Sequence, residues 1–509
     1  MTRAPRAAAA RALAAALGGA CAVALAGPAA RAAEPPTCPV PTQRTETLDA
    51  PAPAPGSCPF LPPATAAWPE EWNVTAESFP VGTTLEWELP PGVSGMTVTL
   101  EAVDAVPEVP FVHESTQVQA PNSAFPIHLT APGGTPWWLI DLTREESYVA
   151  LRGPRAAVGS LQIPNTSLAL DAVADGGLPA GRWSMMVGDL AYGCAIVPPL
   201  NPFCGTGAGL DPPPDLDAYR AGQYRVSVRV RTGAIPDQGT VDLAFYLHRS
   251  FDDRPLRAAD APSDPDVQRM LTSLGAFLGR AGLCVGEVTW IDLPDWAQDR
   301  WAGGVNTHTT CEGSSAELFS LGGAGARVNV FLVPAVTFGD ESAYGFTSAY
   351  PGTPGLSNTI HSGIAGSTED LRTSTGCGAE VHPSACGPDV VAMTVAHELG
   401  HFLGLFHPTE RDGNLFDPLD DTPTCDCRAC APEEERAACE EGSFLLFNPY
   451  CDAEGTACAG ARNLMFWALW TAEGAPPVGE LTPEQGTVLR ANPLVRWPQP
   501  AASADAASP

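Results

Sequence analysis

Hydrophobic and polar residues alternate with a period of two from Trp72 to about Thr232, and prolines and glycines break the alternation into short runs. The runs are TTLEWELP, MTVTLEAV, WWLIDLT, SLALDAV, RWSMMVG and YRVSVRVRTG. This period places successive side chains on opposite faces of a strand, and no long helical period interrupts it. The pattern predicts an all-β sandwich over residues 69–234.

A different pattern begins near Gly239. Three near-continuous apolar runs predict strands: TVDLAFYLH (240–248), GEVTWIDLP (286–294) and ARVNVFLVPAV (326–336). Between the first two, residues 264–282 place apolar side chains three and four positions apart, which predicts an amphipathic helix ending at Gly282. This order of elements predicts a mixed α/β domain over 235–498. We expect residues 499–509 to form a disordered tail.

GPDVVAMTVAHELGHFLG predicts one more helix in this domain. Pro388 stands where a proline is tolerated in a first helical turn, and Gly404 stands where a helix commonly ends. Val391, Val395 and Leu399 predict its buried stripe.

The N-terminus has the parts of a secretory signal peptide, bounded here at residues 1–32. An arginine-containing start precedes an apolar stretch at 12–25 and a small-residue cleavage site at 30–32. The apolar stretch is too short for a convincing membrane span, and the sequence around Cys21 matches a lipid-attachment site poorly. We expect a secreted protein without a membrane span; a cell-surface lipoprotein is the alternative.

Residues 33–68 are rich in proline and alanine, which predicts an exposed linker. Cys38 and Cys58 are candidates for a disulfide that closes it. Outside the signal peptide the chain has fourteen of its 15 cysteines, and paired disulfides are the default in an exported protein. The dense group CDCRAC (425–430) with Cys439 leaves a structural zinc as the alternative to disulfides.

Charge narrows the classes of partner. The formal net charge is −31, and all 27 basic residues are arginine. A chain this acidic is repelled by nucleic acid and by anionic lipid, so we expect no nucleic-acid partner.

The stretch HELGHFLGLFH holds three of the nine histidines. His397 and His401 are four residues apart and project from one helix face, a spacing that lets both imidazoles bind one zinc ion at about 2 Å. Gly404 permits a turn that brings back His407 as a third ligand, whereas ten residues of continuous helix would carry it about 15 Å along the axis. Three neutral histidines leave one position open, the arrangement of a catalytic zinc. The alternative is a histidine-rich helix that packs against the rest of the domain and binds no metal.

Glu398 follows the first of these histidines and points toward the open side of the site. We predict that it acts as general base, taking a proton from water and returning it to the leaving amine, without a covalent acyl-enzyme.

The eleven-residue run resembles the metzincin zinc signature. The motifs after it are similar in order to those of pappalysin-type metalloproteases: DDTP (420–423), the pair Cys451 and Cys458, NLM (463–465) and LTPEQ (481–485). The resemblance implies a metzincin-like α/β catalytic domain with a smaller C-terminal subdomain and a structural methionine turn at Met465. It also implies a substrate extended along an edge strand, which we place in 358–366. The chain departs from many metzincins at Trp467, where they carry a tyrosine.

The same resemblance implies calcium near the acidic loop that follows the third histidine. Asp417, Asp420 and Asp421 are the candidate ligands, since carboxylate oxygens suit Ca²⁺. The alternative is a solvated acidic loop.

Together these features predict a multidomain secreted zinc endopeptidase that hydrolyses protein or peptide substrates. One alternative is a catalytically idle metzincin-like fold that acts as an extracellular binding or adhesion protein, and another is a zinc hydrolase acting on a non-peptide bond. The sequence leaves open whether the sandwich is a prodomain, a targeting module or a spacer.

Overall fold

The computed structural model describes residues 38–498 with gaps, the largest of which fall at 140–157, 189–222 and 425–458. The predicted signal peptide and tail, and the cysteines of the third gap, lie outside the described residues. Within the described ranges, no helix combines the length and the hydrophobicity needed to cross a membrane.

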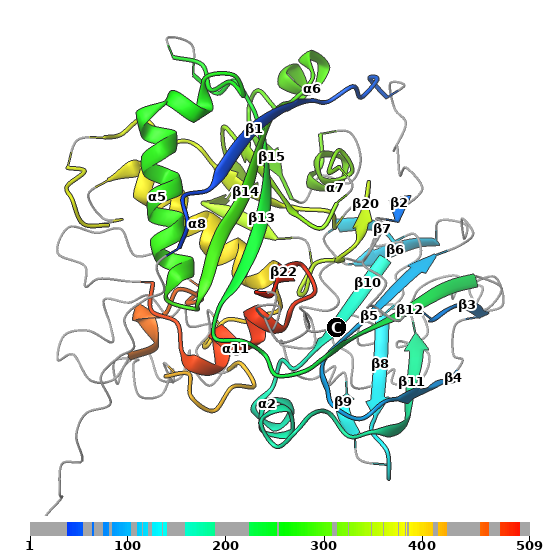
Figure 1. Ribbon diagram of the computed structural model, residues 1–509. Helices are drawn as coiled ribbons and strands as arrows, with labels where there is room; N and C mark the ends of the chain where they lie inside the picture. The colour runs from blue at the N-terminus through cyan, green and yellow to red at the C-terminus, as the bar shows by residue number, and fades with distance from the viewer. Residues whose placement is uncertain are drawn as a thin grey trace, which may run out of the picture. The chain divides into compact units, whose positions relative to one another are not determined.

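The largest sheet has seven strands in the order β1-β14-β13-β16-β21-β19, with β22 paired to β13 (Figure 1). Its strands are β1 (Thr42–Thr47), β13 (Gly239–Leu247), β14 (Leu283–Asp292), β16 (Val328–Val333), β19 (Gly345–Thr347), β21 (Ile364–Ser367) and β22 (Val495–Arg496). Neighbouring strands from β1 to β21 run parallel, and β19 runs antiparallel to β21 at the end of the sheet. The predicted mixed α/β arrangement is confirmed.

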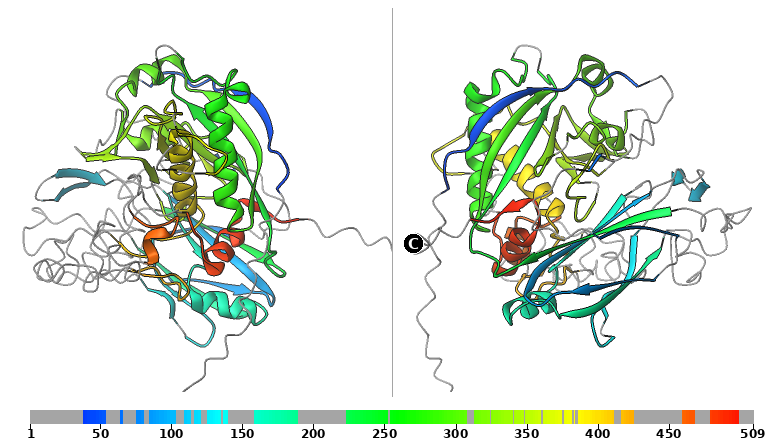
Figure 2. Two further views of the ribbon diagram at one scale, coloured as in Figure 1. Left: turned by 90° about the vertical axis from the view of Figure 1, so that its left-hand side faces the viewer. Right: turned by 45° about the vertical axis from the view of Figure 1, so that its right-hand side comes forward.

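Helices cover both faces of this sheet. They are α5 (Pro265–Gly279), α6 (Asp295–Arg300), α7 (Ser315–Phe319) and α8 (Gly387–Phe402), with α11 (Pro483–Ala491) near the C-terminal end of the chain. In β13, Leu243 and Phe245 belong to the core that includes α5 and α8, whereas Ala244 and Tyr246 belong to the core that includes α6 and α7. Figure 2 shows α5 and α8 side by side. Burial of both sheet faces explains why β13 is almost continuously apolar.

The predicted linker over 33–68 contains a strand of this sheet, which corrects the sequence-based prediction. Strand β1 pairs with β14, and Cys38 forms a disulfide with Cys284 instead of Cys58. The alternation in TQRTET is weak because β1 pairs on one side only and its residues are half-buried or exposed. The sandwich is therefore inserted between two strands of one sheet, β1 and β13.

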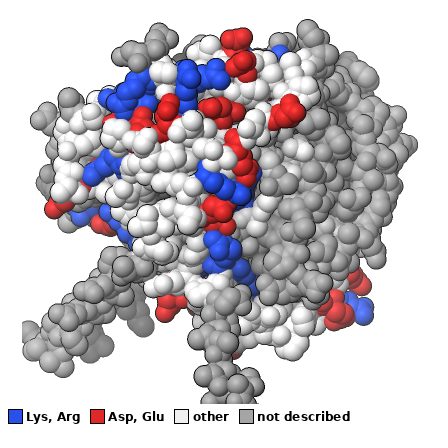
Figure 3. Space-filling model, turned by 45° about the horizontal axis from the view of Figure 1, so that its top comes forward, with Lys and Arg blue, Asp and Glu red and all other residues white. Residues whose placement is uncertain are grey.

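Basic and acidic side chains are interleaved on the face shown in Figure 3. On β1 and its neighbours, Arg44 lies 2.8 Å from Glu46 and 2.7 Å from Glu287, and Arg327 lies 3.1 Å from Glu46. The hydrogen bond from Arg327 lowers the pKa of Glu46 below its ordinary value. These ion pairs link β1 to β14 and to Arg327, the residue that precedes β16.

The inserted segment forms two four-stranded antiparallel sheets, β10-β5-β12-β3 and β4-β11-β8-β9. The strands are β3 (Thr75–Pro80), β4 (Thr84–Leu89), β5 (Val93–Ala102), β8 (Phe125–Thr130), β9 (Pro136–Leu139), β10 (Val158–Ile163), β11 (Gly181–Gly188) and β12 (Gln223–Thr232). Residues from both sheets, Trp183 and Leu100 among them, share one hydrophobic core. Two short strand pairs in the described ranges lie outside these sheets: β2 (Ala64–Thr65) with β20 (Leu356–Ser357), and β6 (Val109–His113) with β7 (Thr116–Ala120). A small three-stranded sheet consists of β15 (Val305–Asn306), β17 (Val336–Phe338) and β18 (Glu341–Ala343).

One predicted sandwich strand, SLALDAV, is wrong. It forms helix α2 (Ser167–Ala174), whose N-terminus is capped by the Thr166 side chain accepting the N–H of Ala169. Leu170 packs into the core of the mixed sheet and Ala169 into that of the sandwich, while Leu168 stays exposed. Seven residues of alternation fit a strand and a helix with two buried sides equally well, and the cap decides between them.

Candidate metal centre

Helix α8 carries the first two histidines. It begins directly after Cys386, which is bonded to Cys377, and ends at Phe402, as the pattern predicted. Its buried Asp389 accepts two hydrogen bonds of 2.7 Å from Arg269 on α5, which fixes the helix against its neighbour. Gly404 then adopts a φ of +111°, a conformation that favours glycine, and reverses the chain.

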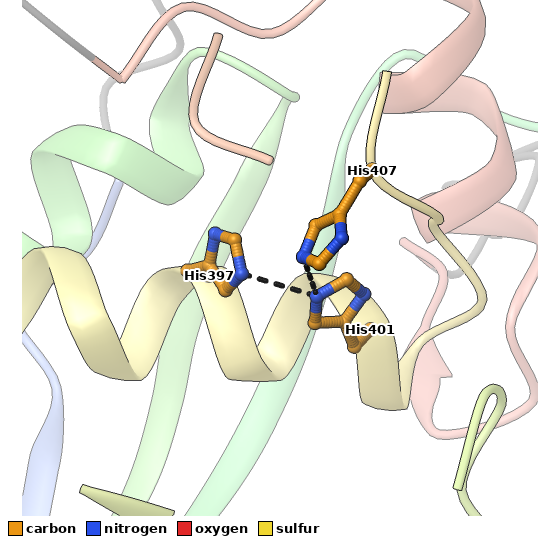
Figure 4. A group of neighbouring side chains, drawn as sticks. All are labelled: His397, His401 and His407. Carbon is orange, nitrogen blue, oxygen red and sulfur yellow. Dashed lines mark hydrogen bonds between the residues drawn. The ribbon is translucent and has the colours of Figure 1, made fainter. Parts of the chain in front are cut away.

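The reversal brings the three predicted histidines together (Figure 4). The Nε2 atom of His401 lies 3.1 Å from Nε2 of His397 and 3.0 Å from Nε2 of His407. His401 is buried and the other two rings are partly buried. Burial lowers the pKa of His397 to about 3, so this imidazole is neutral at neutral pH, as a metal ligand must be.

The outer nitrogens of the three rings face acceptors. Nδ1 of His397 donates to the carbonyl oxygen of Leu464, and Nδ1 of His401 donates to that of Leu405, both at 2.8 Å. Nδ1 of His407 lies 3.1 Å from a carboxylate oxygen of Glu410 but has no hydrogen-bond partner among the described residues. The two carbonyl partners assign the N–H to Nδ1 in His397 and His401, and the nearby Glu410 carboxylate favours the same tautomer in His407.

The residues fit a zinc ion. With each N–H on Nδ1, three Nε2 lone pairs face one another, an arrangement that repels unless a cation lies among them. Tetrahedral coordination at about 2.0–2.1 Å separates two nitrogen ligands by roughly 3.3 Å, close to the observed 3.0–3.1 Å. Among the described residues, this is the one group of three or more His, Cys, Asp or Glu whose ligand atoms converge in this way.

Met465 lies against the helix turn between the first two histidines. It is fully buried, and a Cβ on Gly400 would collide with its Sδ atom. The chain holds it through Asn463, whose side-chain oxygen accepts the Met465 N–H at 2.8 Å and whose amide donates to Gln485 at 2.8 Å. The motifs NLM (463–465) and LTPEQ (481–485) are separate in the sequence and meet beneath His397.

Glu398 is buried between α8 and the last strand of the sheet. The Thr347 hydroxyl on β19 donates to Glu398 Oε2 at 2.6 Å. Burial raises the pKa of Glu398 to about 8, against the lowering effect of this hydrogen bond. A cation bound by the neighbouring histidines would favour the ionised form and lower that pKa.

The edge strand differs from the predicted one. Residues 358–366 overlap β21, which lies between β16 and β19, and the strand at the end of the sheet is β19. A Cβ at Gly345 of β19 would lie 2.8 Å from Glu398 Oε1, so the edge backbone runs directly beside the carboxylate. Strand β19 has only three residues and lies among glycine and serine residues, so its alternation is too short to predict a strand from the sequence.

The three aspartates proposed for calcium have different partners. Asp417 is buried and accepts a 2.5 Å hydrogen bond from Thr422; Asp421 accepts the backbone N–H of Glu484 in the first turn of α11. Asp420 is exposed, and its backbone N–H donates to Ser167. Calcium binding here stays a prediction.

Several residues around the site carried no sequence signal. Thr347 lies on the short strand β19 and Tyr350 in the segment after it; the Tyr350 ring packs edge-on against His401 with centroids 4.2 Å apart. Glu410 follows His407 by three residues and could have been recognised as a carboxylate partner. Trp467, the departure from many metzincins, is partly buried beside Phe466.

Comparisons with known proteins leave the family unassigned. No family model matches the chain, and no curated protein matches it. One similar solved structure is a family two carbohydrate esterase from Cellvibrio japonicus, 9% identical, with 55% of this chain and 77% of that chain covered and a TM-score of 0.12. So low a score indicates neither fold nor function.

Proposed function

We propose that this chain is an exported zinc-dependent endopeptidase with a metzincin-like, pappalysin-type catalytic domain, acting on protein or peptide substrates. The observation that carries the proposal is the convergence of three Nε2 atoms directly beside a buried glutamate. The contact between NLM and LTPEQ beneath His397 supports it, because these motifs also carry the sequence resemblance.

His397, His401 and His407 would hold the zinc ion, which when bound supplies Lewis acidity that polarises a scissile carbonyl and makes water easier to deprotonate. Glu398 takes the proton as the water oxygen bonds to the carbonyl carbon. It returns this proton to the leaving nitrogen when the C–N bond breaks. Thr347 anchors Oε2 of Glu398, which leaves Oε1 as the oxygen that exchanges the proton.

Strand β19 supplies the means to orient a peptide. As the last strand of the sheet, it presents backbone N–H and C=O groups to which an extended chain can pair. Gly345 has no side chain, so the edge backbone stays close to Glu398. A substrate paired with β19 therefore passes beside the general base.

The test is a peptide-library cleavage assay with metal analysis of the purified full chain. We expect one zinc per chain, and for Glu398→Ala we expect retained zinc with activity lower by about 10³-fold or more. Glu88→Ala, which removes an exposed carboxylate of the sandwich, is the matched control and should cleave like the wild type. Equal cleavage by Glu398→Ala rules out the assigned base, and zinc binding without any cleavage favours the binding-protein alternative.

A further inference from the structure

Strand β10 of the inserted sandwich presents different chemistry on its two faces. Leu161 and Ile163 point into the sandwich core. Ser160 and Gln162 alternate with them and bond to residues of the α/β part instead. Because β10 pairs only with β5, it forms the edge of its sheet.

Ser160 contacts the loop that lies over His401. Its hydroxyl lies 2.7 Å from the carbonyl oxygen of Gly352 and 3.1 Å from that of Pro351, and donates its proton to this pair. The N–H of Gly352 in turn donates to the carbonyl oxygen of Phe402, the last residue of α8. Tyr350, one residue before Pro351, packs against the His401 ring. One serine therefore fastens the loop that covers the second histidine.

Gln162 contacts the turn that leads to His407. A Cβ at Gly404 would lie 3.1–3.3 Å from the Gln162 amide atoms, so this side chain fills the space directly behind the turn. Gln162 is 1% exposed, donates to the carbonyl oxygen of Val488 at 3.0 Å and accepts from Asn492 at 2.6 Å. Hydrogen bonds at both the nitrogen and the oxygen of the amide thus fix the position of the Gln162 side chain.

Two further contacts join the same parts of the chain. Buried Arg229 on β12 donates to the carbonyl oxygen of Pro354, in the loop that Ser160 also holds. Ser167 at the start of α2 donates its N–H to the carbonyl oxygen of Pro418 and accepts the N–H of Asp420, both beyond the third histidine. The segments before and after the histidine turn therefore both rest on the inserted sandwich.

We propose that Ser160 and Gln162 are positioning residues for the metal centre, acting through the Tyr350 loop and the Gly404 turn; the inference rests on the metal site of the proposed function. The hydrogen bonds of Ser160 and Gln162 go to other residues than the three histidines. The third ligand lies beyond a glycine turn, and a ligand on a loop holds its geometry only as well as its supporting contacts do. On this proposal the sandwich supports the metal site, and in the sequence it lies between β1 and β13 of the sheet against which α8 packs.

The experiment measures zinc affinity by competition with a chromophoric chelator, and the visible absorption of the Co(II)-loaded chain. The variants are Ser160→Ala, Gln162→Ala and their double variant. Leu161→Ala, on the same strand but in the sandwich core, is the matched control. We expect the double variant to bind zinc about tenfold more weakly and to change the Co(II) spectrum, which reports ligand geometry. Leu161→Ala should lower Tm and leave both readouts unchanged.

Two results overturn the inference. One is a double variant with wild-type affinity and spectrum; the other is a Leu161→Ala chain that loses affinity to the same extent, since the metal site would then follow sandwich stability alone. If the double variant does not fold, the same two measurements are made on Ser160→Ala, which removes only one hydroxyl group. Both readouts need no substrate, so a failure of peptidase activity is separate from a failure of this inference.

Discussion

The Thr347 hydroxyl lies 2.6 Å from Glu398 Oε2 and 2.9 Å from the Glu398 carbonyl oxygen. One side chain of the edge strand thus fixes both the carboxylate and the helix backbone that carries it. The proposed base is therefore held at a fixed position beside the strand that is proposed to pair with substrate.

Thr347→Val keeps the shape of the side chain and removes the hydrogen bond. We expect kcat to fall about tenfold at unchanged zinc content, because the carboxylate loses its orientation. The hydrogen bond lowers the pKa of Glu398, so its loss raises that pKa and moves the acid limb of kcat/KM to higher pH. Thr272→Val, which removes an exposed hydroxyl of α5, is the control, and an unmoved pH profile in Thr347→Val contradicts the assigned contact.

Gly404→Ala tests the turn before the third histidine. The substitution forces a Cβ onto a φ of +111° and against Gln162, and we expect a loss of about 1–3 kcal/mol in the free energy of unfolding, together with weaker zinc binding. Gly275→Ala is the matched control, because a Cβ in the middle of α5 meets nothing within 4 Å. It should stabilise the chain by about 0.5–1 kcal/mol. Urea unfolding of both variants checks the pair; equal effects would mean that Gly404 has no special role.

The disulfide between Cys38 and Cys284 joins the segment just before β1 to β14 across 246 residues of sequence. Replacing both cysteines by serine should lower stability by roughly 2–4 kcal/mol, since the bond constrains a long loop in the unfolded chain. The bond between Cys377 and Cys386 spans nine residues, so its removal should cost less. After a protease cut between β1 and β3, the N-terminal fragment should separate on gels only with reductant; release without reductant contradicts the pairing.

Asp264 makes stability depend on pH. Burial raises its pKa, but hydrogen bonds from Arg372, the Val267 N–H and Arg254 lower it, and the net pKa lies below the ordinary value. A depressed folded-state pKa means that the stabilisation is complete above the unfolded-state value of about 3.9 and is lost as pH falls through the folded-state value. Asp264→Asn should cost about 1–3 kcal/mol near neutral pH and flatten the decline in acid. Urea unfolding across this range measures it, and parallel curves for the two chains would refute the linkage.

The sequence by itself determined the elements whose side-chain pattern is long and local. Helix α8 begins and ends where Pro388 and Gly404 predict, and the spacing of His397 and His401 follows from helix geometry alone. The run of β13 and the periodicity of α5 were readable for the same reason, since each buries its own residues in one regular pattern.

Only the tertiary structure decided which distant segments meet. Strand β1 has too little buried surface to leave a pattern, and its place in the sheet depends on β14 and on Cys284, more than 230 residues away. Thr347 becomes a partner of Glu398 only because β19 closes the sheet beside α8. Ser160 and Gln162 look like the polar face of an ordinary edge strand until the Gly352 loop and the Gly404 turn pack on them. Contacts of this kind are set by packing between elements, which no local period in the chain records.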